Sequence, residues 1–180
     1  KAKARLAPTG DIKQSNIQDA IALHQQGRLS EAKVVYDLIL KADPGNSDAM
    51  HLLGVVAYQN QEYQFAVELI GNALEINPDN HEAYSNRGNA LMALKQFEAA
   101  LKCFDLAISL NPDFADAHYN KANTLIELKQ FEAALVSFDL TISLNPNFAD
   151  AYCNRGNAML ELKLFESALE SFDLAISLAP

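Results

Sequence analysis

The sequence predicts an all-α solenoid, a stack of antiparallel helix pairs, on the basis of three recurring features. Five prolines, Pro44, Pro78, Pro112, Pro146 and Pro180, stand 34 residues apart, and this interval is the repeat length of helix-turn-helix arrays. In every interval a small residue stands twelve positions before an alanine, and a bulky residue follows that alanine after four positions. We therefore divide the chain into 1–12, a leader, linker or cloning remnant, and one array of five units, 13–46, 47–80, 81–114, 115–148 and 149–180.

The third unit shows the two helices expected in each unit. Tyr84, Gly88 and Leu91 lie on one face of a first helix over about 82–94, and Phe97 to Ile108 follows the apolar spacing of a second helix. The small residues are expected to let two helix backbones approach closely; they are Ala20, Gly54, Gly88, Ala122 and Gly156. Proline then ends the second helix. Asp79, Asp113 and Asn147 are candidate N-caps for the next unit.

This order of bulky, small, alanine, aromatic and proline positions resembles the tetratricopeptide repeat family over roughly 13–180. The resemblance implies a right-handed superhelix of ten helices, in which the first helices line a concave surface. Three departures stand out. The chain has no tryptophan, the usual leucine before the small residue is replaced by Arg87, Lys121 and Arg155, and the turn glycine occurs only as Gly27. The equivalent turn positions hold Gln61, Lys95, Lys129 and Lys163, where left-handed geometry would cost each about 1 kcal/mol relative to glycine.

Composition excludes several classes of partner. The net charge of −9 and pI of about 4.8 argue against nucleic acid or an anionic membrane, because both need clustered basic residues. The apolar runs are short and periodic, so no membrane-spanning segment is expected. Cys103 and Cys153 fall at unrelated positions, which fits a reducing compartment and a cytoplasmic location.

No pattern in the sequence indicates catalysis, a metal or a cofactor. The histidines do not have ligand spacing, and the motifs of metalloproteases, phosphate-binding loops and serine hydrolases are absent. The recurring acidic residues Asp48, Glu82, Asp116 and Asp150 are expected in the first turns of helices, where they favour the helix dipole. We therefore expect a protein that is not an enzyme.

Two rows of asparagines are the candidate binding residues. They occupy the same two places in the first helices of the last three units, Asn86 and Asn89, Asn120 and Asn123, and Asn154 and Asn157. Residues three apart share one helix face, and the resemblance implies that these point into the concave surface. An amide can donate to and accept from the backbone of an extended peptide. The alternative interpretation is that these asparagines belong to the general consensus of the repeat and do not contact a ligand.

The first two units lack these rows, with Gln18 and Ile21 and then Leu52 and Val55 in their place, so the groove is expected to be more apolar there. His51, Tyr58 and Tyr119 are possible additional groove contacts. The chaperone-binding members of the family hold a terminal carboxylate with a lysine; the equivalent positions here are Ile17, His51, Ser85, Tyr119 and Cys153. A heat-shock chaperone tail is therefore a poor candidate ligand.

A second row is basic. Arg87, Lys121 and Arg155 recur together with Asp105, Asp139 and Asp173 of the same units, and pairing between the two rows is expected to hold these charges at a partly buried seam. Recognition of acidic groups in a ligand is the alternative.

Three functions are compatible with these observations. The first is a non-catalytic scaffold that binds an extended peptide or protein segment. The second is the substrate-recruiting arm of a larger enzyme, because the asparagine rows and the opening units resemble those of O-linked N-acetylglucosamine transferases and their bacterial relatives. The third is self-association through the last second helix, whose apolar residues are expected to be uncovered; they are Phe165, Leu169, Phe172 and Ile176.

Overall fold

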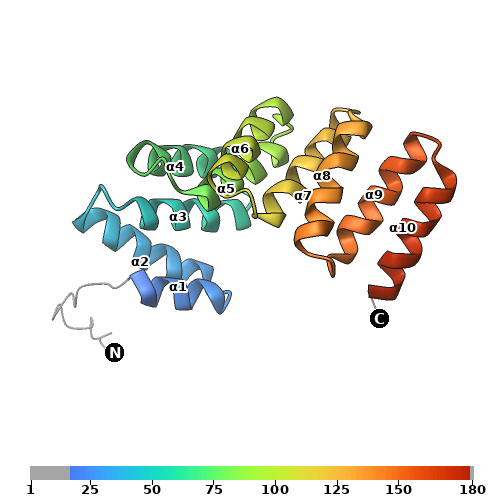
Figure 1. The fold of residues 1–180 in the computed structure, drawn as a ribbon. Coiled ribbons are helices and arrows are strands. Elements are labelled where there is room, and N and C mark those ends of the chain that lie inside the picture. Colours follow the sequence, from blue (N-terminus) through green and yellow to red (C-terminus); the bar gives the residue numbers. More distant parts are fainter. Residues whose placement is uncertain (1–16, 179–180) are drawn as a thin grey trace.

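The computed structural model describes residues 17–178 and is built of helices alone over that range. The predicted leader, residues 1–12, and Pro180 lie outside the described residues. The ten helices are α1 Ile17–Gln25, α2 Leu29–Ala42, α3 Ser47–Gln59, α4 Tyr63–Ile76, α5 His81–Ala93, α6 Phe97–Leu110, α7 Ala115–Glu127, α8 Phe131–Leu144, α9 Ala149–Glu161 and α10 Phe165–Leu178. They form consecutive antiparallel pairs around a curve, with α1 and α10 at opposite ends (Figure 1). The predicted all-α solenoid is confirmed.

The helices form an inner and an outer layer. Every helix packs against its neighbours in sequence, and the first helices of successive pairs also contact one another, α1 with α3, α3 with α5, α5 with α7 and α7 with α9. Within residues 17–178, no such contact joins the second helices of successive pairs. The more closely spaced layer lies on the inside of the curve, so the odd-numbered helices line its concave side.

The core is a series of small clusters. One joins Ala20, Tyr36 and Val56 of the first two pairs, and another joins Ala66, Leu91, Phe104 and neighbours in the second and third pairs. A third lies in the last two pairs, around Ala122, Phe138 and Ala158. Each cluster spans adjacent pairs, as expected when stability is a sum over units and their interfaces.

The small residues allow a large side chain of the second helix to approach the first helix closely. A Cβ atom added to Gly88 would lie 2.6 Å from Cε1 of Phe104, and at Gly156 the equivalent distance to Phe172 is 2.7 Å. The atoms that approach most closely are therefore side-chain atoms of the second helix. This contact joins the two helices of one pair.

The expected left-handed turns are present. Gly27 has φ of 73°, and the equivalent residues Gln61, Lys95, Lys129 and Lys163 have φ of 64°, 58°, 57° and 61°. In the third unit the N–H of Lys95 donates to the carbonyl of Met92, and that of Gln96 donates to the carbonyl of Leu91. This is the Schellman arrangement, which needs a left-handed residue.

The predicted N-caps Asp79, Asp113 and Asn147 are wrong. The caps of α3 and α5 are Asn46 and Asn80, whose side chains accept hydrogen bonds from the N–H groups of Ala49 and Ala83 at 2.9 Å. In α7 and α9 the same position holds phenylalanine, which makes no cap. The N–H groups of the three predicted caps instead donate to the side chains of Asn77, Asn111 and Asn145, each at 3.3 Å, and so close an Asx turn around the proline.

Candidate peptide-binding groove

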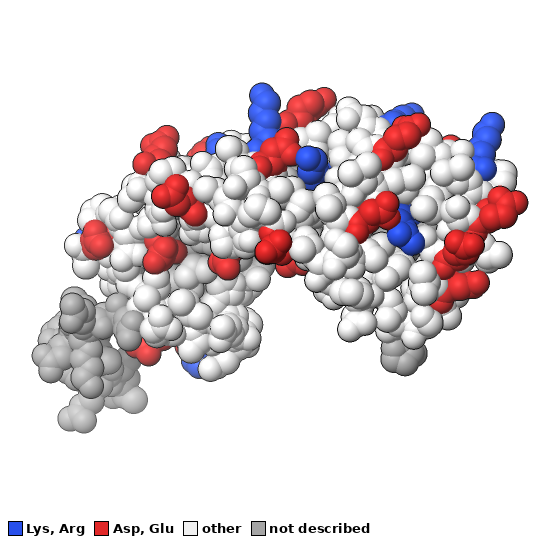
Figure 2. Space-filling view, viewed as in Figure 1, with Lys and Arg blue, Asp and Glu red and all other residues white. Residues whose placement is uncertain are grey.

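The asparagine rows lie on the concave layer. Asn86 and Asn89 are on α5, Asn120 and Asn123 on α7, and Asn154 and Asn157 on α9, the three consecutive first helices that contact one another. In Figure 2, acidic and basic side chains gather along the upper, outer side of the molecule, whereas the hollow on the lower side is bordered mostly by uncharged residues. The rows therefore belong to a surface that is polar without being strongly charged.

The two rows are joined from one unit to the next. The amide of Asn154 donates to Oδ1 of Asn123 at 2.9 Å and to the hydroxyl of Tyr119 at 3.0 Å, both in the preceding unit. In the same way, Nδ2 of Asn86 lies 2.9 Å from Nε2 of His51. Three of the six asparagines thus have partners inside the array, which supports a structural contribution from them.

The other three asparagines have no side-chain hydrogen bond among residues 17–178; they are Asn89, Asn120 and Asn157. A local reason is visible for Asn120. The residue that precedes it by 35 positions is Ser85, whereas Asn86 and Asn154 find His51 and Tyr119 at that separation. A serine side chain is too short to span the gap that a histidine or tyrosine spans, so this amide keeps its capacity to donate and accept.

Two adjoining cavities lie beside the last asparagines. One of about 260 Å³ is lined by Met92, Asn123, Ile126, Glu127, Asn154 and Asn157. The other, of about 450 Å³, is lined by Ile126, Glu127, Lys129, Phe131, Asn157, Ala158 and Glu161. They share Ile126, Glu127 and Asn157, and together place the unpaired amide of Asn157 beside both apolar and charged side chains. That combination suits an extended chain, whose backbone is polar and whose side chains are partly apolar.

The N-terminal part of the concave layer has a cavity of its own, with both apolar and polar walls. This cavity of about 420 Å³ is lined by Ile21, His24, Gln25, Tyr36, Leu52 and Gln59. The hydroxyl of Tyr36 is buried there without a hydrogen-bond partner among the described residues. The sequence analysis did not identify this hydroxyl group. The available signal was that Tyr36 stands where the last three units have phenylalanine. Tyr58, a predicted groove contact, packs against Tyr63 with the ring centres 5.5 Å apart.

His51 is held neutral by its surroundings. It is only 5% exposed, and this desolvation lowers its pKa below the ordinary value, outweighing the attraction of Glu82 and Asp48, which raises it. A neutral imidazole can accept the hydrogen bond from the Asn86 amide through Nε2, whereas the protonated ring cannot.

The basic row forms ion pairs with the row of aspartates. Nζ of Lys121 lies 2.7 Å from Asp105, and the guanidinium of Arg155 lies 2.8 Å from Asp139. The expected pairing between the two rows is confirmed for these residues, and each aspartate belongs to the preceding unit. The reason is geometric, since this face of a first helix packs against the second helix before it.

The apolar residues of α10 predicted to mediate self-association are largely exposed. Phe165 is 60% exposed, Leu169 62% and Ile176 71%, while Phe172 is only partly exposed because its ring lies over Gly156.

The histidines do not converge. His24 contacts Gln59, His81 contacts Asn111, and His118 contacts the carbonyl of Pro112. Over residues 17–178, no group of three or more His, Cys, Asp or Glu side chains could hold a metal ion. Both cysteines are free thiols, Cys103 buried and Cys153 exposed. None of the described helices is long and apolar enough to span a bilayer.

Comparison with solved structures supports both the fold and the class of protein. A crystal structure of MamA is 26% identical, with a TM-score of 0.82, 95% of this chain and 96% of that chain being covered. YrrB, described as a TPR protein with an unusual peptide-binding site, is 26% identical with a TM-score of 0.76 over 93% of this chain and 89% of its own. PilF of Pseudomonas aeruginosa, 24% identical over 91% of this chain and 75% of its own, has a TM-score of 0.84 and shows the fold alone.

Comparison with curated protein sequences gives no match, and the matches above show no link to O-linked N-acetylglucosamine transferases, so that resemblance stays a prediction. Family models do match. Models described as tetratricopeptide repeat cover residues 17–81, 81–114, 115–148 and 149–180. The chain belongs to the tetratricopeptide repeat family.

Proposed function

We propose that this chain is a non-catalytic scaffold that binds an extended peptide or protein segment along its concave layer. The observation that supports this most directly is the set of unpaired amides, Asn89, Asn120 and Asn157, in a surface where the neighbouring asparagines are already bonded. Free amides at successive units can alternate as donors and acceptors along a peptide backbone. The similarity to YrrB, a peptide-binding TPR protein by its description, supports the same function.

The experiment compares two triple variants. In the first, Asn89, Asn120 and Asn157 are replaced by alanine, which removes only the unpaired amides. In the control, Asn60, Gln130 and Asn147 are replaced by alanine; these are exposed amides in the turns. Twelve-residue peptides are selected on the unmodified chain by phage display, and their affinities are then measured by fluorescence anisotropy.

The first variant is expected to weaken binding by at least about tenfold, because each lost neutral hydrogen bond contributes about 0.5–1.5 kcal/mol. The control is expected to bind like the unmodified chain. Equal affinities for all three proteins, or failure to select any peptide, would contradict the groove assignment.

A second candidate function is association between copies of the chain through α10. Its support is the exposure of Phe165, Leu169 and Ile176 on one helix, since contiguous apolar surface of this kind marks interaction sites. In sedimentation velocity the chain should show concentration-dependent association, which Phe165→Glu with Leu169→Glu should abolish. Val136→Glu is the control, because Val136 is equally exposed, at 62%, on α8. A strict monomer at high concentration would exclude this function.

A further inference from the structure

The junction between the second and third units lacks an ion pair that is present at both later junctions. Lys121 and Arg155 each contact an aspartate of the preceding unit, Asp105 and Asp139. The equivalent cation in the third unit is Arg87, and the position that should supply its aspartate is Gly71. Arg87 therefore occupies the same seam without its acidic partner.

A second contact of this cation is also missing. Nε of Arg155 donates to the hydroxyl of Ser171 at 3.0 Å. The residue equivalent to Ser171 in the third unit is Cys103, and sulfur is a weak acceptor. Nε of Arg87 is accordingly buried with no hydrogen-bond partner among the described residues. An unpaired buried donor is costly and rare in folded proteins.

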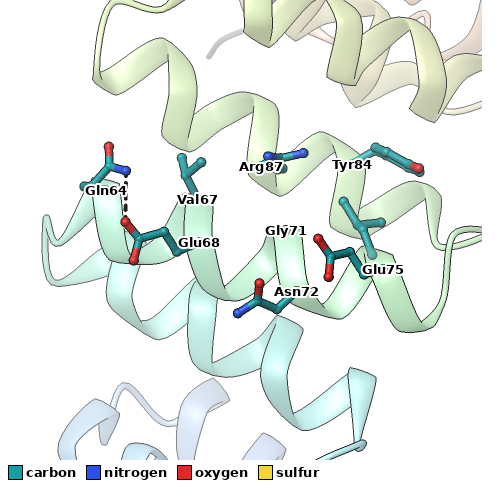
Figure 3. A pocket seen from close by; sticks show the side chains of 9 residues that line it. Gln64, Val67, Glu68, Gly71, Asn72, Glu75, Tyr84 and Arg87 are labelled. Atoms are coloured by element: carbon teal, nitrogen blue, oxygen red, sulfur yellow. Dashed lines mark hydrogen bonds between the residues drawn. The ribbon is translucent and has the colours of Figure 1, made fainter.

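A cavity lies beside the position of the missing aspartate. This cavity of about 490 Å³ lies between α4 and α5 and is lined by Gln64, Val67, Glu68, Gly71, Asn72, Leu74, Glu75, Tyr84 and Arg87. Arg87 and Tyr84 come from α5, and Glu68, Asn72 and Glu75 from α4 (Figure 3). A Cβ atom on Gly71 would lie 3.5 Å from a terminal nitrogen of Arg87, so the guanidinium is directly above the glycine and faces the cavity.

The cavity is distinct from the concave groove. It shares no lining residue with the three groove cavities described above. On a helix with 3.6 residues per turn, Arg87 points about 100° away from Asn86 and about 200° away from Asn89. A ligand at Arg87 would therefore contact a different side of α5 from a peptide bound to the asparagines.

The charges around the cavity define what it can accept. Neither Glu68 nor Glu75 forms an ion pair with Arg87 in the described part of the chain, and Glu68 is bonded to Gln64 at 3.1 Å. A carboxylate can take the bidentate geometry that a guanidinium offers. Two glutamates on the opposite wall repel an isolated anion, but attract basic groups beside it.

We propose that the Arg87 cavity binds an acidic side chain of a partner protein, flanked by basic residues. The incoming carboxylate takes the place of the aspartate present at the later junctions, and the flanking cations face Glu68 and Glu75. Tyr84 also lines this cavity. The equivalent tyrosine, Tyr152, lies against Arg155, with 5.3 Å between the guanidinium carbon and the ring centre.

The test uses arginine side-chain signals. The chain has four arginines, Arg5, Arg28, Arg87 and Arg155, so a ¹⁵N correlation spectrum of their Nε–H groups is simple to assign. Two capped pentapeptides serve as ligands, Lys-Gly-Asp-Gly-Lys and Lys-Gly-Asn-Gly-Lys, with sodium acetate as a third. The aspartate peptide is expected to shift the Arg87 signal with an affinity at least about fivefold higher than the asparagine peptide, and to leave the Arg155 signal unchanged.

Two variants provide the structural controls. Gly71→Asp supplies the missing partner and should abolish the response of Arg87. Asp139→Gly removes the partner of Arg155 and should make that signal respond. Equal shifts with both peptides, or a response that persists in a folded Gly71→Asp variant, would overturn the site. Acetate as effective as the aspartate peptide would overturn the contribution of Glu68 and Glu75.

Discussion

Replacing Lys95 by glycine should stabilise the protein, because this exposed residue is held at φ of 58°. A residue with a Cβ atom pays about 1–2 kcal/mol for left-handed geometry, whereas glycine pays about 0.5–1 kcal/mol for its greater freedom in the unfolded chain. The net gain is about 0.5–1 kcal/mol. The same replacement at all four left-handed positions should raise the free energy of unfolding by about 2–4 kcal/mol, because distant sites are additive; they are Gln61, Lys95, Lys129 and Lys163.

The matched control is the next residue. Gln96 has φ of −91°, so Gln96→Gly removes no strain and should lower stability by about 0.5–1 kcal/mol. Gly27→Ala tests the opposite direction. A Cβ atom at Gly27 would meet nothing within 4 Å, but φ there is 73°, so the expected loss of about 1 kcal/mol is due to the backbone alone.

Urea unfolding followed by circular dichroism and by tyrosine fluorescence measures these changes. Agreement between the two signals checks that the array unfolds in one step, which repeat proteins do not always do. Lys95→Gly and Gln96→Gly must change the midpoint in opposite directions. If both lower it equally, backbone strain at the turns does not limit stability and the reasoning is refuted.

Three further predictions concern buried groups. Stability should fall as the pH drops from about 7 to 5, because burial lowers the pKa of His51 and the unfolded chain then binds the proton more readily; His51→Gln should flatten the profile, and an unchanged slope would contradict this. A thiol reagent should label Cys153 rapidly and Cys103 only on unfolding, since Cys103 is buried and burial raises the pKa of its thiol. Equal labelling rates of the two cysteines in the folded protein would contradict this. Gly88→Ala should lower the unfolding midpoint despite better helix propensity, because its Cβ would overlap Phe104, and a raised midpoint would show that the ring can move.

The sequence period predicted the parts of the fold that depend on one unit alone. Proline positions located the helix ends, and Gly27 located the turn whose left-handed geometry recurs at Lys95 and its equivalents. A glycine opposite an aromatic residue predicted a close approach, although the ring rather than a second backbone fills the space at Gly88. These features are local or confined to one helix pair, so spacing along the chain is enough to find them.

The sequence pattern did not predict the contacts between units in detail. The period gives equivalent positions but not which unit a side chain faces, so it did not determine which aspartate of the row Arg155 contacts; in the structure this is Asp139. The same limit applies to the asparagines. Their shared helix face was predictable, but the bond from Asn154 to Asn123 depends on how α9 lies against α7.

Departures from the repeat are the more informative positions once the fold is known. Where the facing residue of the preceding unit is long enough, polar groups satisfy one another, as Tyr119 and Asn154 do. Where it is too short, a partner is left over: Ser85 leaves the Asn120 side chain unpaired, and Gly71 leaves Arg87 facing a cavity. Nε of Arg87 is buried without a partner among the described residues, so it costs free energy without supporting the fold. A ligand that satisfies the guanidinium recovers that cost on binding, so the site proposed at Arg87 lies where this junction departs from the later ones.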